Sequence, residues 1–346
     1  MASLAHEEVI VRSGQRSGLP VIIAVHSTAL GQAVGGCRIW RYPDWRDGLD
    51  DALRLSAGMT RKCALAGAAN GGGKTVVAVP PGASLDGARR TGLLHDVGDA
   101  IASLGGRYAT GPDVGTTPRD MAVISQRTTH VFCLPTELGG SGDSSPNTAT
   151  GVVAAVEAVC ARLYGRADPR SRRIAIVGLG NVGAHLARQL AAAGAELLVS
   201  DIDPAKKALA AELLATWAEP GEALTAPVDV LIPAALGGVL TSDIVPALRC
   251  AAIVGPANNQ LAEPSVARLL HERDIIWVPD YVAGAGGVIY ALAVELHKMP
   301  PEEARARVRS IADTVGLVLA GSAESGADPA QVAMELADRR ILNGEG

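Results

Sequence analysis

Two lysines, Lys62 and Lys74, stand in a glycine-rich and almost uncharged stretch of the sequence. Lys62 ends the run Met-Thr-Arg-Lys, and Lys74 follows three consecutive glycines. Lysine is rare in this chain, because only five of its 31 basic residues are lysines and the others are arginines. A lysine can lose its proton when it is desolvated or lies beside another cation, whereas an arginine does not. Two lysines that converge on one pocket would meet both conditions, so we interpret them as a candidate chemical site.

The second candidate site is a glycine-rich turn in the second half of the chain. The run Gly-Leu-Gly-Asn-Val-Gly at 178–183 follows a predicted strand and opens a predicted helix. Its first glycine allows the tight turn, its second lets a pyrophosphate approach the backbone, and its third permits close packing of helix on strand. The N-terminus of the helix then offers unpaired N–H groups to the phosphates. The pattern predicts a dinucleotide-binding site formed by Gly178, Leu179, Gly180, Asn181, Val182 and Gly183.

An acidic residue follows the next predicted strand, at 197–200, and helps to identify the nucleotide. Asp201 stands where a carboxylate can bind the 2′-hydroxyl of a ribose and repel a 2′-phosphate. A plain strand–turn–helix junction would leave this residue unexplained. Lys206 and Lys207 lie nearby and weaken the preference slightly, but we place them on a solvated helix face. We therefore expect NAD rather than NADP.

The composition is that of a globular protein with two domains. The chain has 346 residues, of which 48% are apolar and 19% charged, and it is long for a single core. Its net charge of −5 and its lack of a basic run argue against nucleic acid. We expect no membrane span, since no apolar stretch approaches about 20 residues, and no N-terminal signal peptide. The five cysteines are scattered without a zinc-binding pattern, which indicates reduced thiols in a cytoplasmic protein and a site without metal.

Hydrophobic periodicity predicts α/β structure in both halves of the chain. The glycine- and serine-rich run at 139–146 predicts a linker between them, and beyond it short apolar strands alternate with helices, as in a βαβ fold. In the first half we expect strands at 19–26, 75–79 and 131–134, helices at 50–60 and 93–104, and a loop at 31–36. In the second half we expect a helix at 148–164, strands at 173–178, 196–200, 228–232, 251–254 and 275–278, and a helical tail at 302–342.

Several short motifs follow one another in an order that is specific to one family. They are Gly-Gly-Cys-Arg at 35–38, Met-Thr-Arg-Lys at 59–62, Gly-Gly-Gly-Lys at 71–74, Gly-Arg-Tyr at 106–108, Asp-Val-Gly-Thr at 113–116, Ser-Pro-Asn-Thr-Ala at 145–149, Pro-Ala-Ala-Leu-Gly-Gly at 233–238, Ala-Asn-Asn-Gln-Leu at 257–261 and Pro-Asp-Tyr-Val at 279–282. From about residue 21 to its C-terminus, the chain resembles the Glu/Leu/Phe/Val amino-acid dehydrogenases, most closely the leucine, valine and phenylalanine branch.

The resemblance implies an α/β fold of two domains, with the nucleotide domain second. Residues 1–146 would form an α/β domain that binds substrate and mediates oligomerisation, and residues 147–322 a Rossmann-type domain that binds NAD. The active site would lie in the cleft between the two, and a C-terminal helix at 323–346 would pack back onto the first domain. The resemblance also implies a homo-oligomer, at least a dimer.

The resemblance further implies NAD-dependent oxidative deamination of an L-amino acid to a 2-oxo acid and ammonia, and its reverse. Lys62 resembles the lysine that holds the substrate carboxylate, Lys74 the catalytic lysine, and Asp113 the acid that exchanges protons with the amino group. A carboxylate in a dry cleft needs a fixed cation, and a buried lysine beside a second ammonium can act as a general base near neutral pH. By the same resemblance, Gly36 and Asn259 would contact the substrate carboxylate, and Thr148, Ala234 and Asn258 the cofactor.

One departure from the family pattern follows the last motif. The family usually reads Asp-Tyr-Val-x-Asn-Ala-Gly-Gly, whereas this chain has Gly284 in place of the asparagine and loses an amide on the cofactor side. The resemblance also implies that the pocket for the substrate side chain includes Gly111, Val288 and Ala291, which are small and suit a branched-chain aliphatic or aromatic substrate. Gly111, where branched-chain enzymes tend to carry alanine, should leave extra room.

Simpler interpretations remain open for these residues. The glycines before Lys74 could form only a turn, Asp113 could only cap a helix or turn, and Cys37 and Cys63 fit small packing residues better than reactive thiols. Two other functions also remain: an oxidoreductase for a non-standard amino acid or imine, permitted by Gly284, and an NAD-binding regulator without turnover. Lys62, Lys74 and Asp113 argue against the regulator, because a protein that only binds NAD needs no buried pair of like charges.

Overall fold

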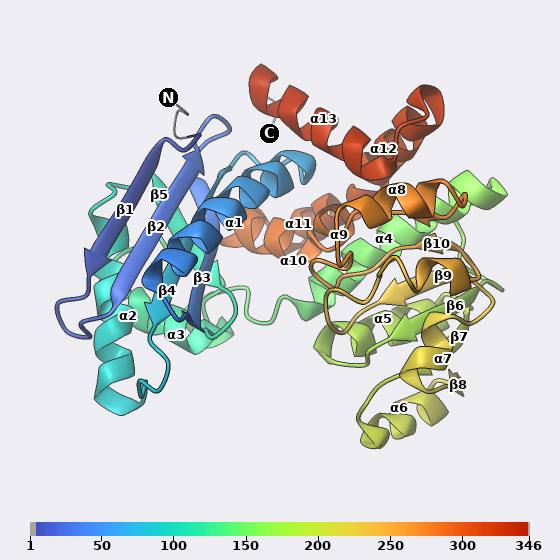
Figure 1. The fold of residues 1–346 in the computed structure, drawn as a ribbon, viewed down its shortest axis with the longest axis horizontal. Helices are drawn as coiled ribbons and strands as arrows, with labels where there is room; N and C mark the ends of the chain where they lie inside the picture. The colour runs from blue at the N-terminus through green and yellow to red at the C-terminus, as the bar shows by residue number, and fades with distance from the viewer. Residues whose placement is uncertain (1–4, 345–346) are drawn as a thin grey trace. The chain divides into compact units, whose positions relative to one another are not determined.

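Each of two β-sheets organises one unit of the chain in the computed structural model, which describes residues 5–344 (Figure 1). The first unit is the chain up to Asp143, together with Ala291–Met299 and the end of the chain from Ala337. The second unit comprises Ser144–Tyr290 and Pro300–Leu336. The expected α/β class is confirmed. Residues 1–4 of the expected first domain and residues 345–346 of the expected final helix lie outside the described residues.

Five strands form the sheet of the first unit: β1 (Glu8–Ser13), β2 (Pro20–Ser27), β3 (Ala33–Arg41), β4 (Gly71–Val79) and β5 (Tyr108–Pro112). Their order across the sheet is β1-β2-β4-β3-β5. Strand β2 is antiparallel to both of its neighbours, whereas β3 is parallel to both β4 and β5. Most residues of β2 and all residues of β4 are buried, so both faces of the sheet must be covered.

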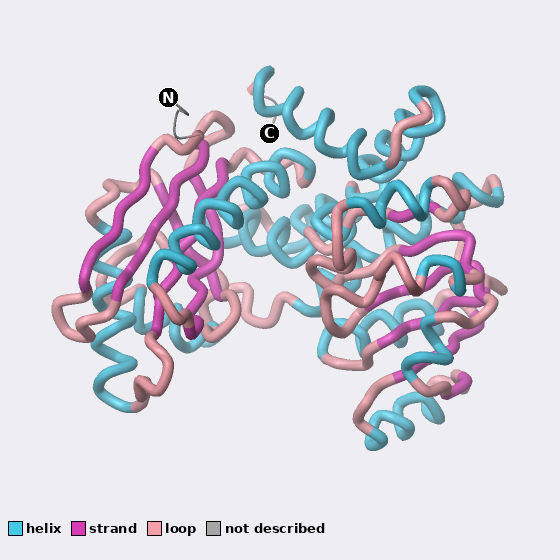
Figure 2. Tube along the Cα trace, in the orientation of Figure 1, coloured by secondary structure: helices cyan, strands magenta, loops and turns pink. Residues whose placement is uncertain are grey.

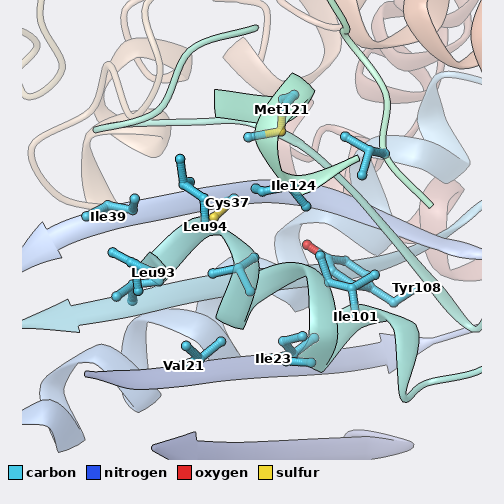
Figure 3. Packing of buried hydrophobic residues seen from close by; sticks show 14 of the residues in the cluster. Val21, Ile23, Cys37, Ile39, Leu93, Leu94, Ile101, Tyr108, Met121 and Ile124 are labelled. Atoms are coloured by element: carbon cyan, nitrogen blue, oxygen red, sulfur yellow. The ribbon is translucent and has the colours of Figure 1, made fainter. Parts of the chain in front are cut away.

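Helices cover the two faces of this sheet. Successive side chains of a strand point to opposite faces, so Ile22 joins the apolar core under helix α1 (Trp45–Leu65). Val21, one residue earlier, joins the core under α2 (Gly87–Ala102) and α3 (Pro118–Ile124). Figure 3 shows this second core, which includes Val21, Ile23, Cys37, Ile39, Leu93, Leu94, Ile101, Tyr108, Met121 and Ile124.

Two glycine runs of the first unit belong to strands. The expected loop at 31–36 is wrong over most of its length, because β3 begins at Ala33, and the glycines at 71–73 lie in β4. Glycine weakens a strand and is found where another backbone comes close. At Gly72 an added Cβ would collide with the backbone of Thr60 on α1. The glycine therefore allows the helix to lie directly against the sheet.

Six strands form the sheet of the second unit: β6 (Arg173–Val177), β7 (Glu196–Ser200), β8 (Thr216–Trp217), β9 (Val228–Pro233), β10 (Cys250–Ile253) and β11 (Ile276–Trp277). All neighbours are parallel, in the order β11-β10-β9-β6-β7-β8. Read from the other edge, this is the strand order of dinucleotide-binding folds, with the order reversing between β6 and β9. The strands expected from the sequence of this half agree with the observed ones to within one residue at each end.

Helices flank the strands of the second sheet, as Figure 2 shows. The expected connecting helix is present as α4, which starts three residues earlier than expected. The α-helices from α4 to α12 are α4 (Ser145–Tyr164), α5 (Asn181–Ala192), α6 (Lys207–Glu212), α7 (Pro220–Leu224), α8 (Ser265–His271), α9 (Asp280–Ala283), α10 (Gly286–Ala291), α11 (Pro301–Arg309) and α12 (Ile311–Ser325).

The helical tail differs from expectation at its last element. Helix α12 ends at Ser325 and is capped by Gly326, whose φ is +73°, so the expected continuous helix at 323–346 is interrupted. The final helix, α13, spans Pro329–Asn343. Its Arg340 donates hydrogen bonds to the carbonyl groups of Ala64 and Leu65 at the end of α1. Among the described residues, no helix is long and apolar enough to cross a membrane.

Candidate active site

Strand β4 places Lys74 near the centre of the first sheet. Lys74 lies two residues before Val76, so its side chain leaves the sheet on the face that α1 covers. Its ammonium nitrogen (Nζ) lies 2.7 Å from a carboxylate oxygen (Oδ2) of Asp113, and the lysine side chain is only 7% exposed. Asp113 directly follows β5. The structure therefore brings together two residues that sequence reasoning assigned to one site.

Burial and charge act together on this pair. Burial lowers the pKa of Lys74 below its ordinary value, and the guanidinium of Arg38 lowers it further, although Asp113 acts in the opposite direction. Burial alone would raise the pKa of Asp113, but Lys74 and Arg38 outweigh it and hold that pKa below its ordinary value. The pair is thus an ionised carboxylate beside an amine that gives up its proton more readily than a solvated lysine.

Arg38 is a residue of this site to which sequence reasoning gave no role. Its Nε donates to Oδ2 of Asp113 at 2.9 Å, the same oxygen that Lys74 contacts. Its Nη1 donates to Asp51 of helix α1 at 3.2 Å. A signal was present in the sequence, because Arg38 lies two residues after Gly36 and residues at this spacing share one face of a strand.

Gly36 and Lys62 are the carboxylate contacts expected in the first unit. Gly36 lies in β3, and a Cβ added there would lie 3.2 Å from Nζ of Lys74 and 2.6 Å from Cβ of Asp113. The absence of a side chain at Gly36 therefore lets Asp113 and Lys74 lie close to strand β3. Lys62 lies half-buried in the last turn of α1, two residues after Thr60, whose backbone contacts β4.

The extra room expected at Gly111 is occupied by another side chain. Gly111 pairs with Gly36 in the register of β5 and β3. A Cβ added at Gly111 would lie 2.5 Å from a ring carbon (Cε2) of Phe132. Phe132 is the single phenylalanine of the chain, and only 3% of it is exposed. The expectation of a larger pocket here is therefore wrong, because the glycine makes space for this ring.

The glycine turn of the second unit fits a pyrophosphate. Gly178 has a φ of +110°, which favours glycine, and an added Cβ would lie 2.7 Å from Cβ of Ala235. Gly180 directly precedes helix α5; no atom lies within 4 Å of an added Cβ there, and no side chain caps the helix. An added Cβ at Gly183 would strike the backbone of Gly178. The turn therefore presents the N–H groups of a helix N-terminus where phosphates have space to approach.

Asp201, at the end of β7, is held against this turn. Its Oδ2 accepts a hydrogen bond from the N–H of Leu179 at 2.6 Å, and its Oδ1 accepts one from the N–H of Asp203 at 2.9 Å. These bonds orient the carboxylate beside the glycine turn. Each oxygen has a second lone pair, so the carboxylate can also accept from a ribose hydroxyl.

The other expected contacts are divided between the two units. Ala291 belongs to the first unit, whereas the second contains Thr148, Ala234, Asn258, Asn259 and Val288. The N–H of Asn259 donates to Asp280 at 2.9 Å, and this residue has a left-handed φ of +53°. Gly284 has a φ of −83°, which any residue can adopt, so its backbone conformation does not require glycine. The expected active-site cleft between the two domains stays a prediction.

Glu295 is a buried carboxylate that sequence reasoning missed. It lies in a π-helical turn (Leu292–Leu296) and is only 9% exposed. Its Oε1 accepts hydrogen bonds from the N–H groups of Cys133 at 2.9 Å and Ser141 at 2.8 Å, and its Oε2 accepts one from Leu134 at 3.2 Å. One side chain thus binds the backbone at both ends of the segment 133–141.

Replacing Glu295 with alanine is expected to lower the free energy of unfolding by about 3 kcal/mol, because buried N–H groups lose a charged acceptor. Glu295→Gln is expected to cost less, since its carbonyl oxygen can still accept from Cys133 and Ser141. Urea unfolding measures both effects. Glu137→Ala, at an exposed position in the same segment, is the matched control. Equal stability of Glu295→Ala and this control would contradict the assigned role.

Two family models match the chain. Residues 5–130 match the dimerisation domain of the Glu/Leu/Phe/Val dehydrogenases. Residues 139–205 and 201–337 match the glutamate/leucine/phenylalanine/valine dehydrogenase model. The matches thus extend over most of both units.

Individual relatives are similar over nearly their whole length. The chain is 38% identical to leucine dehydrogenase of Geobacillus stearothermophilus, over 99% of this chain and 92% of that protein. It is 39% identical to valine dehydrogenase of Streptomyces albus, over 97% of this chain and 92% of that protein. The crystal structure of L-tryptophan dehydrogenase from Nostoc punctiforme matches with a TM-score of 0.87 and 36% identity, over 99% of this chain and 97% of that one. The chain therefore belongs to the Glu/Leu/Phe/Val family of amino-acid dehydrogenases.

Proposed function

We propose that the chain catalyses the reversible, NAD-dependent oxidative deamination of an apolar L-amino acid to a 2-oxo acid and ammonia. The observation that carries this proposal is the contact of Lys74 with Asp113, since it supplies a buried base with a lowered pKa beside an ionised carboxylate. The names of the relatives support the substrate class, because leucine, valine and tryptophan are all apolar.

In this proposal each charged residue of the first unit has a separate role. Lys62 binds the substrate carboxylate, with Gly36 and Asn259 as further contacts. Bound NAD would accept the hydride from Cα of the substrate. Lys74 then takes a proton from the water that attacks the resulting imine carbon, and Asp113 exchanges a proton with the departing amino group.

A panel of L-amino acids tests the substrate class. We expect NADH to form with one or more of leucine, valine, phenylalanine and tryptophan, whereas glutamate should fail because Gly111, Val288 and Ala291 offer no cation for its side chain. D-Leucine is a control for stereochemistry. Binding of NAD without turnover of any apolar amino acid would favour the regulator and contradict the proposal.

We also propose that NAD is preferred over NADP, because Asp201 would repel a 2′-phosphate. Asp201→Ser is expected to raise kcat/KM for NADP by about tenfold or more, since it removes that repulsion. Asp203→Ser is the matched control, because Asp203 is exposed and its side chain caps the segment that follows. Equal kcat/KM values for the two coenzymes in the wild-type protein would contradict the proposed preference.

We propose a homo-oligomer of at least two chains, in keeping with the description of the matched dimerisation domain. Light scattering of the purified protein measures the mass directly. A mass equal to that of one chain, 35.3 kDa, would contradict this proposal.

A further inference from the structure

A line of charged side chains connects Lys74 to helix α1. Oδ2 of Asp113 lies 2.7 Å from Nζ of Lys74 and 2.9 Å from Nε of Arg38, so two cations share one oxygen. The other end of Arg38 lies 3.2 Å from Asp51. Asp51 is held independently, because it accepts a hydrogen bond from the hydroxyl of Tyr42 at 2.7 Å. The guanidinium of Arg38 is therefore held between the carboxylates of Asp113 and Asp51.

The proposed function, on which this inference rests, requires Lys74 to alternate between its charged and neutral forms. When Lys74 loses its proton, it no longer balances Asp113, whose side chain is only 22% exposed. A carboxylate that is buried without a counter-charge is strongly disfavoured. Arginine keeps its charge throughout the pH range of enzyme activity. We propose that Arg38 is a positioning residue that keeps Asp113 paired and oriented while Lys74 exchanges its proton.

The other groups that act on Lys74 are consistent with this role. Besides burial, the groups with the largest effects on its pKa are Asp113, Arg38 and Cys37. Burial raises the pKa of Cys37 to about 12, so this thiol stays neutral while Lys74 titrates. Arg38 lowers the pKa of both Lys74 and Asp113. Removing the charge of Arg38 should therefore change how tightly Lys74 holds its proton.

Direct titration of Lys74 tests the proposal without any need for turnover. NMR of the full-length protein with isotope-labelled lysine should show five side-chain signals, and Lys74→Arg identifies the signal of Lys74. We expect Arg38→Gln to raise the pKa of Lys74, because Asp113 then depends on Lys74 alone, and Arg38→Lys to restore it toward the wild-type value. Arg54→Gln is the matched control, since Arg54 binds Asp51 from an exposed position and should leave the pKa unchanged.

The pH profile of kcat/KM is the second readout. Arg38→Gln should move its ascending limb to higher pH, which lowers kcat/KM near neutral pH by about tenfold. Should Arg38→Gln fail to fold, Arg38→Met removes the same charge with an apolar side chain. An unchanged Lys74 pKa in either folded variant, or an equal loss of activity at every pH, would overturn the proposal. A wild-type protein without turnover would contradict the proposed function, whereas the titration would still decide the role of Arg38.

Discussion

Lys74→Ala is expected to reduce kcat for oxidative deamination by about 10²–10⁴-fold, the usual contribution of a general base. The reason is that Lys74 is the buried amine of the site and burial lowers its pKa below the ordinary value of a lysine. NAD binding, measured by calorimetry, should be unchanged, because Lys74 lies in the first unit and the glycine turn in the second. Steady-state assays of the purified variant measure the loss.

Lys207→Ala is the control for this variant, since Lys207 is exposed and lies over the ring of Trp217. The pH dependence gives a second check on Lys74. A base acts in its deprotonated form, so kcat/KM should rise with pH until Lys74 has lost its proton. Because the pKa of Lys74 is lowered, this rise should end below the pH at which a solvated lysine titrates. Full activity in Lys74→Ala would rule out the proposed mechanism.

Asp113→Asn is expected to have the second-largest effect, and it should act on both turnover and stability. The amide leaves Lys74 and Arg38 without the oxygen charge that they share at 2.7 and 2.9 Å. Breaking a buried ion pair costs several kcal/mol, so we expect the free energy of unfolding at neutral pH to fall by about 3 kcal/mol. We also expect kcat to fall by about 10²-fold or more. Urea unfolding and steady-state assays measure the two effects.

The stability difference should depend on pH in a defined direction. The pKa of Asp113 is lowered in the folded protein, so its ionised form stabilises the fold above the unfolded pKa, about 3.9 for an aspartate. This contribution is lost as the pH falls through the folded pKa. Asp120→Asn is the matched control, because Asp120 pairs with Arg90 at 2.9 Å with its side chain 11% exposed. It should lose stability and keep its turnover; equal kcat values in both variants would contradict the role of Asp113.

Five strands of the second unit could be predicted from the sequence to within one residue at each end, whereas the short strand β8 was not expected. Parallel strands that are buried on both faces appear as short apolar runs between helices, and strand β7 spans 196–200 as expected. Strand β3 was not expected and β4 was expected only from residue 75, because glycines interrupt their apolar pattern. The physical reason for Gly72 is its contact with Thr60 of α1, which lies elsewhere in the sequence.

The site was predictable only where the residue type is itself unusual. A lysine among glycines indicated Lys74, and the motif after β5 indicated Asp113. Arg38 and Glu295 belong to residue types that are common on surfaces, so only the fold reveals that one shares an oxygen of Asp113 and the other binds three backbone N–H groups. Gly111 was misinterpreted for the same reason, since the residue that fills its space is not adjacent in sequence.

The ring of Phe132 fills the space beside Gly111, although the two residues lie 21 positions apart in the chain. The first side-chain carbon of any other residue at position 111 would lie 2.5 Å from the ring of Phe132, so something would have to shift. A mutant library that varies position 111 alone therefore requires this ring to move in every variant, however well each new side chain suits the substrate. A smaller residue at 132 removes that barrier. For engineering, positions 111 and 132 are therefore best varied together.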